Sequence, residues 1–153
     1  MLQLLQDLYL FKGLSQSDLA LIVDISELKS YRTDEKIFSQ ADTANSFYVI
    51  QHGSVSIDQS EDDEHTVQVA SLGTGSHFGE MALLDKEPRS ASASAMSDSD
   101  IVRIAYAPML DLLNSNPKIE VHFYRELSKF LCSRLRFTTL DLSYSRSQNV
   151  GLF

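Results

Sequence analysis

One arginine in this sequence lies in a stretch that could hold a small anion. Gly79 has no side chain, so another group can approach its backbone closely. Residues 80–84 carry a short helical pattern, and the first amides of a helix lack intrahelical acceptors and attract anions. Arg89 follows Pro88 and offers a planar set of donors that suits two phosphate oxygens. Residues 78–92 therefore predict an anion-binding cradle.

A carboxylate in the same stretch narrows the ligand further. Glu80 would repel a phosphate, but it could accept hydrogen bonds from hydroxyl groups such as those of a ribose. Ser90 adds a hydroxyl and an amide beside the arginine. A phosphate next to a ribose describes a nucleotide. The alternative is that Glu80 and Arg89 only form an ion pair with each other while residues 82–84 belong to the core.

Composition limits the class of protein. The 153 residues predict one domain, and 43% hydrophobic with 22% charged residues is typical of a soluble globular chain. No apolar run approaches the ~20 residues that span a bilayer, and no signal sequence is evident, so we expect a cytoplasmic protein that does not enter a membrane. The net charge of −8 disfavours nucleic acid as a partner of this chain alone.

Several residues that could carry other chemistry have simpler interpretations. The single cysteine, Cys132, excludes an internal disulfide and is expected to be a buried structural thiol. The four histidines do not have a metal-ligand spacing, so no metal site is predicted, and His77 is expected in a surface turn. The acidic run 61–64 is expected to be a solvated hairpin tip. No nucleophile motif or paired carboxylates indicate an enzyme.

The elements that must position the cradle follow from the hydrophobic period. Residues 1–27 predict two amphipathic helices, with Ser15 as the cap of the second. Residues 28–106 change to a period of two and predict about eight short strands. Seven of them are placed at 30–32, 36–38, 46–50, 55–58, 67–72, 90–95 and 101–104, and the last two follow the cradle. This pattern predicts a mainly β fold with flanking helices, a double-sheet roll.

Helices return in residues 108–142. A short helix after Pro108 ends at 114–116, and Pro117 is placed to begin a longer one. The longer helix carries a rough heptad that is broken at Thr138, which could cover its own domain or pair with a second copy of the chain. The tail 143–153 is polar and is expected to be loosely held.

The cradle resembles a known binding site. Residues 78–84 through 89–91 look like the phosphate-binding cassette of the cyclic nucleotide-binding domain, the family of the catabolite activator protein and of protein kinase A regulatory subunits. The likeness extends from about residue 10 to 139 and includes 37–42 and 47–55. It implies a jelly roll (a double-stranded β-helix) with N-terminal helices and a C-terminal helical lid, in a single domain 1–153 without a DNA-binding domain.

The resemblance also assigns roles. Arg89 would pair with the cyclic phosphate and Glu80 would accept from the ribose 2′-hydroxyl. The cassette residues expected at the ligand are Gly79, Glu80, Met81, Ala82, Arg89, Ser90 and Ala91, with the amides of Ala82 and Ser90 on the phosphate. Candidate base contacts are Val69, Leu72, Thr138 and Thr139.

The function implied is a non-enzymatic sensor without a cofactor. Its ligand would be cAMP, favoured over cGMP, and binding would draw the last helix over the base. Two alternatives stay open: a ligand-free interaction or dimerisation module of the same fold, and the sensor part of a longer transcription regulator. Asp34 and Ala41 stand where the family usually has turn glycines, so we expect an altered turn there.

Overall fold

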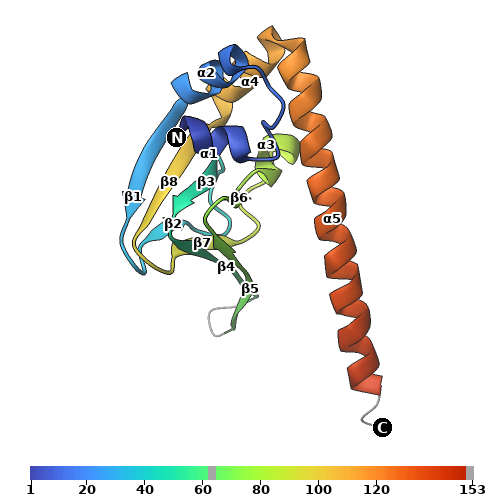
Figure 1. Cartoon of the computed structure of the whole chain (residues 1–153). Coiled ribbons are helices and arrows are strands. Elements are labelled where there is room, and N and C mark those ends of the chain that lie inside the picture. The colour runs from blue at the N-terminus through green and yellow to red at the C-terminus, as the bar shows by residue number, and fades with distance from the viewer. Residues whose placement is uncertain (62–64, 151–153) are drawn as a thin grey trace.

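The computed structural model describes residues 1–61 and 65–150 (Figure 1). Its helices are α1 (Leu2–Asp7), α2 (Gln16–Asp24), α3 (Met81–Asp85), α4 (Tyr106–Ser115) and α5 (Pro117–Val150). Its strands are β1 (Ser26–Tyr31), β2 (Lys36–Phe38), β3 (Ser46–His52), β4 (Ser54–Ser60), β5 (Thr66–Gly73), β6 (His77–Phe78), β7 (Ser92–Ala95) and β8 (Ser99–Ala105).

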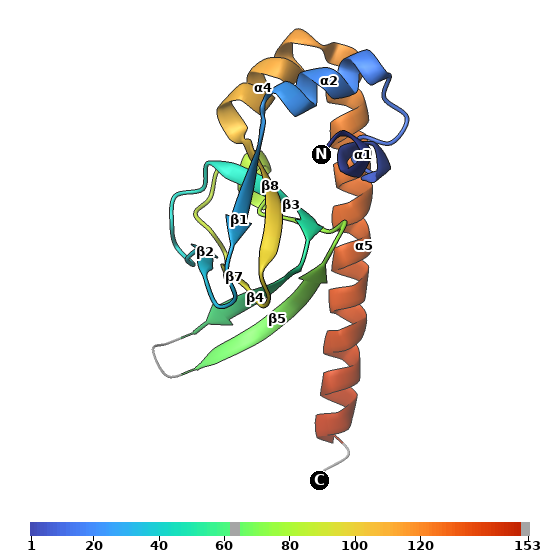
Figure 2. The ribbon, with the colours of Figure 1, turned by 60° about the vertical axis from the view of Figure 1, so that its left-hand side comes forward.

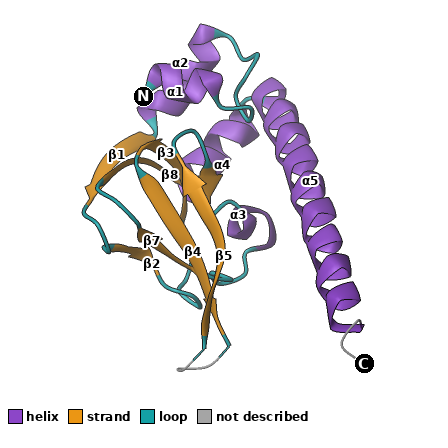
Figure 3. Ribbon diagram, turned by 60° about the horizontal axis from the view of Figure 1, so that its bottom comes forward, coloured by secondary structure: helices purple, strands orange, loops and turns teal. Residues whose placement is uncertain are grey.

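The strands of the described residues form two antiparallel four-stranded sheets. One has the order β1-β8-β3-β6 and the other the order β2-β7-β4-β5. Helices α1, α2 and α4 gather at one end of the roll, and the β4–β5 hairpin projects from the other end (Figure 1). Figure 3 shows α3 on the side of the roll that faces α5. The predicted jelly roll with flanking helices is confirmed.

Strand β3 connects two hydrophobic cores. Tyr48 and Ile50 belong to a buried cluster that has residues from both sheets, so it lies between them. Phe47 and Val49 are wholly buried in a second cluster, which they share with the helices. Neighbouring side chains of a strand point to opposite faces, so consecutive residues of β3 serve both cores.

The starts of α2 and α5 follow local sequence signals, whereas α4 starts earlier than predicted. The Asp18 amide donates to Oγ of Ser15 at 3.1 Å, which confirms the predicted cap of α2. Pro117 begins α5, as predicted. Helix α4 starts at Tyr106, before its predicted start after Pro108. A proline in the first turn breaks no intrahelical hydrogen bond, so it can lie inside that turn.

Helix α5 runs to Val150, past residue 142 where its end was predicted (Figure 2). Thr138 donates from Oγ1 to the Arg134 carbonyl at 3.0 Å, and Thr139 donates to the Leu135 carbonyl at 2.8 Å. Each hydroxyl is thus satisfied by the preceding turn of the same helix. The polar residues therefore do not interrupt α5, and 143–150 continue it instead of forming a loose tail.

The turns at Asp34 and Ala41 are not altered, contrary to expectation. Both residues adopt the left-handed conformation that glycine would take, with φ of 67° and 69°. The Ala41 amide donates to the Arg89 carbonyl at 2.8 Å, and the Arg89 amide donates to the Asp42 carbonyl at 2.9 Å. This pairing keeps the turn at residue 41 in place despite the cost of a left-handed alanine.

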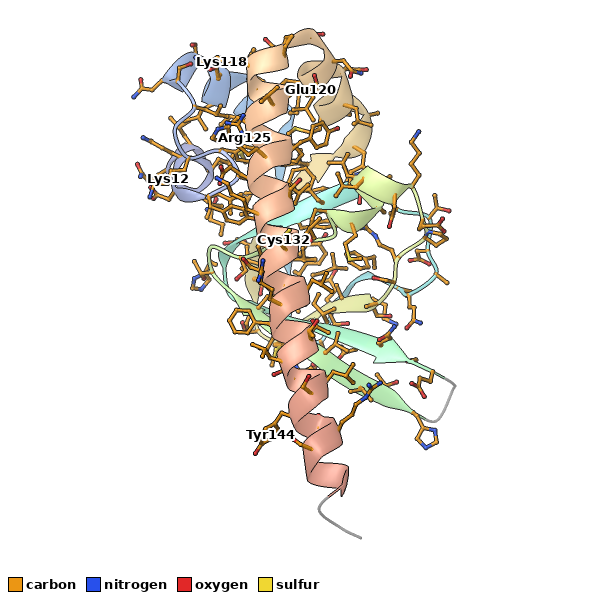
Figure 4. All side chains as sticks on the ribbon, turned by 90° about the vertical axis from the view of Figure 1, so that its right-hand side faces the viewer. Lys12, Lys118, Glu120, Arg125, Cys132 and Tyr144 are labelled. Carbon is orange, nitrogen blue, oxygen red and sulfur yellow. The ribbon has the colours of Figure 1, made fainter. Side chains whose placement is uncertain are left out.

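Cys132 lies on α5 and is exposed, so the prediction of a buried thiol is wrong (Figure 4). The buried side chains of α5 lie in its first turns, at Ile119, Phe123 and Leu127. Phe130 and Leu131 are half-buried against this core, and from Leu135 to Tyr144 the large apolar residues of α5 are exposed.

The structure also bears on the predictions about membrane spanning and about the acidic run 61–64. No helix among the described residues is long and apolar enough to cross a membrane. Of the acidic run 61–64, only Glu61 is described; it follows β4, which pairs with β5. The remainder of the predicted hairpin tip lies outside the described residues.

Candidate functional site

The cassette at residues 78–92 connects β6 to β7. Gly79 has a φ of +79°, and a Cβ atom at this position would lie 2.8 Å from Nη1 of Arg89 and 3.4 Å from the Tyr48 ring. Helix α3 follows, and its C-cap residue, Lys86, adopts the left-handed conformation. Glycine is therefore required at residue 79 by its φ and by the arginine that packs on it.

Arg89 is buried, with 6% of its surface exposed, and it bonds only to neutral groups among the described residues. Its Nη1 donates to the Gly79 carbonyl at 2.9 Å and to the Tyr106 hydroxyl at 3.2 Å. Its Nη2 donates to the Ser46 carbonyl at 2.6 Å. The Phe38 ring lies against the guanidinium, 4.0 Å from Cζ to the ring centroid. A buried cation held only by neutral groups favours the binding of an anion.

Tyr106 joins this arginine to the helices. It is the first residue of α4, and its hydroxyl donates to the Gly79 carbonyl. Burial raises the pKa of Tyr106 to about 12, although the charge of Arg89 opposes the shift. The phenol is therefore protonated at neutral pH and keeps its role as a donor to the cassette.

Glu80 is also buried, but it does not pair with Arg89. Its Oε2 lies 3.0 Å from Nδ1 of His77. His77 was expected in a surface turn, and this prediction is wrong: it lies in β6, paired with Val49 of β3, and only 3% of it is exposed. The acid and the base of the cassette thus have separate partners, and the simple ion-pair interpretation of Glu80 and Arg89 does not hold.

These groups line a pocket of about 150 Å³. All the cassette residues predicted from the sequence line it, namely Gly79, Glu80, Met81, Ala82, Arg89, Ser90 and Ala91. Phe38 and Ile57 contribute from the sheet of β2 and β4, and Arg134 contributes from α5. The pocket therefore brings together the cassette, one sheet and the last helix.

The four candidate base contacts do not line this pocket. Val69 and Leu72 lie on β5, where Val69 is 53% exposed and Leu72 is half-buried. Thr138 and Thr139 are exposed on α5, beyond Arg134. Their contacts with a base stay a prediction.

Some residues of the site had no local signal in the sequence. Phe38 fits the alternation of a strand, and Tyr106 fits the start of a helix. Arg134 lies in a helical pattern that gives no sign of a contact with the cassette. His77 and Tyr9, whose hydroxyl contacts His77, lie 68 residues apart. Only the folded chain shows that these side chains meet around the cassette.

Known proteins are similar to this chain in sequence and in fold. A profile described as "Cyclic nucleotide-binding domain" matches residues 28–116, more than half of the chain. The cAMP-dependent protein kinase type II regulatory subunit of Drosophila melanogaster is 32% identical over 124 residues, which are 74% of this chain and 32% of that protein. The Cyclic AMP receptor protein of Thermus thermophilus is 30% identical over 143 residues, 92% of this chain and 64% of that protein.

The solved structure of the Thermus thermophilus Catabolite Activator Protein superposes with a TM-score of 0.76 at 30% identity. The likeness covers 88% of this chain and 61% of that one. The chain thus spans about a third of the Drosophila relative and slightly less than two thirds of the Thermus relative.

Proposed function

Because the chain belongs to the cyclic nucleotide-binding domain family, we propose that it is a non-enzymatic sensor that binds a cyclic mononucleotide. The observation that supports this most directly is Arg89. Its buried guanidinium lines the pocket and has no carboxylate partner in the described part of the chain. A cyclic phosphate would supply the missing negative charge.

The site has hydrogen-bonding groups for both the phosphate and the ribose of such a ligand. A guanidinium has five N–H donors, and three of those of Arg89 are used by described neighbours, which leaves two for phosphate oxygens. The amides of Ala82 and Ser90 would add donors to the phosphate. Glu80 would accept a hydrogen bond from the ribose 2′-hydroxyl. No cofactor is needed for this recognition.

Helix α5 is the element that would report binding. Arg134 already lines the pocket, and Thr138 and Thr139 follow one turn further along the helix. We propose that the ligand draws α5 toward the pocket, so that these threonines reach the base beside Val69 and Leu72. Such a movement is a shift between two populations of α5, biased by the ligand.

We favour cAMP over cGMP as the ligand. The names of both relatives described above refer to cAMP. Ser90, directly after the arginine, is compatible with either base, because the resemblance places a hydroxyl there in cGMP-selective members as well. Measuring the affinities of cAMP and cGMP therefore decides between the two ligands.

The outer part of α5 suggests a second copy of the chain as a partner. Large apolar side chains are exposed along it, at Leu135 (68%), Phe137 (69%), Leu140 (66%), Leu142 (51%) and Tyr144 (67%). Exposed apolar patches of this kind mark association surfaces, and Leu135 and Leu142 are one heptad apart. A module that associates through α5 without a nucleotide is the alternative function. Nucleic acid is not proposed as a partner of this chain, whose net charge is −8.

Thermal unfolding with cAMP, cGMP and linear AMP tests the proposal. At a concentration of 100 times its dissociation constant, a ligand that binds only the folded state adds about 2.7 kcal/mol to the free energy of unfolding. We expect such a shift with a cyclic nucleotide and a much smaller one with linear AMP. No shift with any nucleotide would contradict the sensor and favour the ligand-free module.

Arginine variants test the assigned phosphate contact. Arg89→Lys keeps the charge but loses the planar fork, and we expect it to weaken binding at least tenfold. Arg89→Ala should remove binding, with folding checked by circular dichroism. Arg32→Ala changes an exposed arginine and should bind as the wild type does. Unchanged affinity in Arg89→Lys and in a folded Arg89→Ala would refute the role of Arg89.

A further inference from the structure

A chain of buried hydrogen-bonded side chains lies behind the carboxylate of Glu80. The two ring nitrogens of His77 contact different partners: Nδ1 lies 3.0 Å from Oε2 of Glu80, and Nε2 contacts the Tyr9 hydroxyl. His77 is 3% exposed and Glu80 is 5% exposed. Tyr9 follows α1, so this Tyr9–His77–Glu80 relay leads from the N-terminal segment to the pocket.

The chemistry of the three groups fixes the direction of the hydrogen bonds. An ionised Glu80 can only accept, so the proton of a neutral His77 ring belongs on Nδ1. Nε2 is then an acceptor and receives the Tyr9 hydroxyl proton. Burial, and after it the negative charge of Glu80, raises the pKa of Tyr9 above its usual range, so the phenol stays protonated and can donate.

Packing holds the histidine ring in this orientation. The Phe130 ring of α5 lies 4.4 Å from the His77 ring between centroids, and the Tyr9 ring lies 5.3 Å from it. Tyr9 and Phe130 also stack on each other at 5.4 Å. The His77 ring is thus packed between Tyr9 and Phe130, which restricts its movement. Glu80 is therefore hydrogen-bonded to a side chain that is held in place.

We propose that His77 is the positioning residue for ribose recognition: its Nδ1–H holds the Glu80 carboxylate toward the ribose 2′-hydroxyl, and the Tyr9 hydroxyl, as donor to Nε2, supports this tautomer. This inference rests on the proposed function, since it concerns how the same pocket reads the sugar. A carboxylate that binds a ligand is effective when a second group fixes its orientation. The discrimination between a ribose and a 2′-deoxyribose should therefore depend on His77, which does not itself line the pocket.

The test measures the affinities of cAMP and of 2′-deoxy-cAMP for each variant by calorimetry. A hydrogen bond to a charged group predicts that the wild type prefers cAMP by roughly ten- to a hundredfold. Glu80→Ala should reduce this ratio to near one. His77→Phe keeps a planar ring without donors, and it should lower the affinity for cAMP and reduce the ratio about tenfold while the affinity for 2′-deoxy-cAMP changes little.

Two milder variants separate positioning from folding. His77→Asn can place an amide donor near Nδ1 and should restore much of the ratio that His77→Phe loses. Tyr9→Phe keeps the stacked ring and removes only the hydroxyl, and we expect the ratio to fall about two- to tenfold. His52→Gln changes an exposed histidine at the end of β3 and should leave the ratio unchanged.

The outcomes separate this inference from the proposed function. If the wild type binds no cyclic nucleotide, the proposed function fails. If it binds both ligands equally, Glu80 does not read the hydroxyl and the positioning role is refuted while the sensor stands. If His77→Phe, His77→Asn and Tyr9→Phe keep the wild-type ratio, or lose affinity for both ligands to the same extent, His77 is only a core residue.

Discussion

At the scale of single residues, the proposed phosphate site depends on a turn with an unusual alanine. Ala41 has a φ of 69°, and its amide donates to the carbonyl of Arg89. Because Asp42 accepts from the Arg89 amide, the turn holds the backbone of the arginine on both sides. A left-handed conformation costs a residue with a Cβ roughly 1–2 kcal/mol. The chain therefore carries backbone strain next to the group that is proposed to bind the ligand.

Replacing this alanine by glycine should stabilise the fold. Glycine removes the left-handed cost but loses roughly 0.5–1 kcal/mol of chain entropy, so we expect Ala41→Gly to raise the free energy of unfolding by about 0.5–1 kcal/mol. Urea denaturation measures the change. Ala20→Gly, in an exposed position of α2, is the matched control and should lose up to about 1 kcal/mol. A destabilised Ala41→Gly would contradict the left-handed turn.

At the scale of elements, the cassette and α4 are joined through Tyr106. Its phenol donates to the Gly79 carbonyl and accepts from Arg89, so the helix cannot shift without disturbing the arginine. Both bonds involve the neutral phenol, and burial holds the pKa of Tyr106 at about 12, above its ordinary value near 10. The contact between α4 and the cassette should therefore weaken in alkali.

The pH dependence of stability tests this contact. In the unfolded chain the phenol ionises near pH 10, whereas in the folded protein it keeps its proton to about pH 12. The contribution of Tyr106 is thus fully present below pH 10 and is lost as pH rises from 10 toward 12. Urea unfolding of Tyr106→Phe should show a shallower loss over this range than the wild type.

Exposed Tyr144 provides the control for that series. Tyr144→Phe should follow the wild-type pH profile when both are measured as monomers, because this side chain is 67% exposed on α5 within one chain. A Tyr106→Phe profile parallel to that of the wild type would show that the buried phenol does not contribute to alkaline unfolding.

At the scale of the whole molecule, the roll is compact while α5 extends beyond it (Figures 1 and 2). The apolar side chains of its outer part are not covered by the described residues. If a second copy covers them, the protein in solution should have twice the 17.2 kDa mass of one chain. Light scattering measures this mass directly.

Charge substitutions on one side of α5 test the proposed dimer. Leu135→Asp with Leu142→Asp places two carboxylates one heptad apart, and we expect the double variant to be monomeric with the roll intact. Leu21→Asp, an exposed position of α2, should leave the mass unchanged. A monomeric wild type, or a double variant with the wild-type mass, would refute pairing through this side of α5.

The sequence predicts most where structure is local. The alternation of the strands, the Ser15 cap and the boundaries of the cassette follow from neighbouring residues, and the structure has all three. Glycine at 79 was predicted from the need for close approach, and the +79° φ gives the physical reason. These features depend on a few adjacent residues, so they can be predicted from a single sequence.

The wrong predictions concern contacts between distant segments. His77 is polar and follows a turn, which favours an exposed position, yet Tyr9 and Phe130 bury it. Cys132 has an apolar helical spacing, but it lies on a side of α5 that no described element covers. The period of a helix predicts which residues share a face, but it does not tell what lies against that face.

The position of His77 between the two ends of the chain has a consequence for biosynthesis. Tyr9 is synthesised before the cassette, and Phe130, which belongs to α5, is synthesised after it. A domain of this kind folds as a unit, so the ring cluster cannot close while α5 is still in the ribosome. The ring cluster around His77 and the pocket that Arg134 lines are therefore completed only after this part of α5 has left the ribosome.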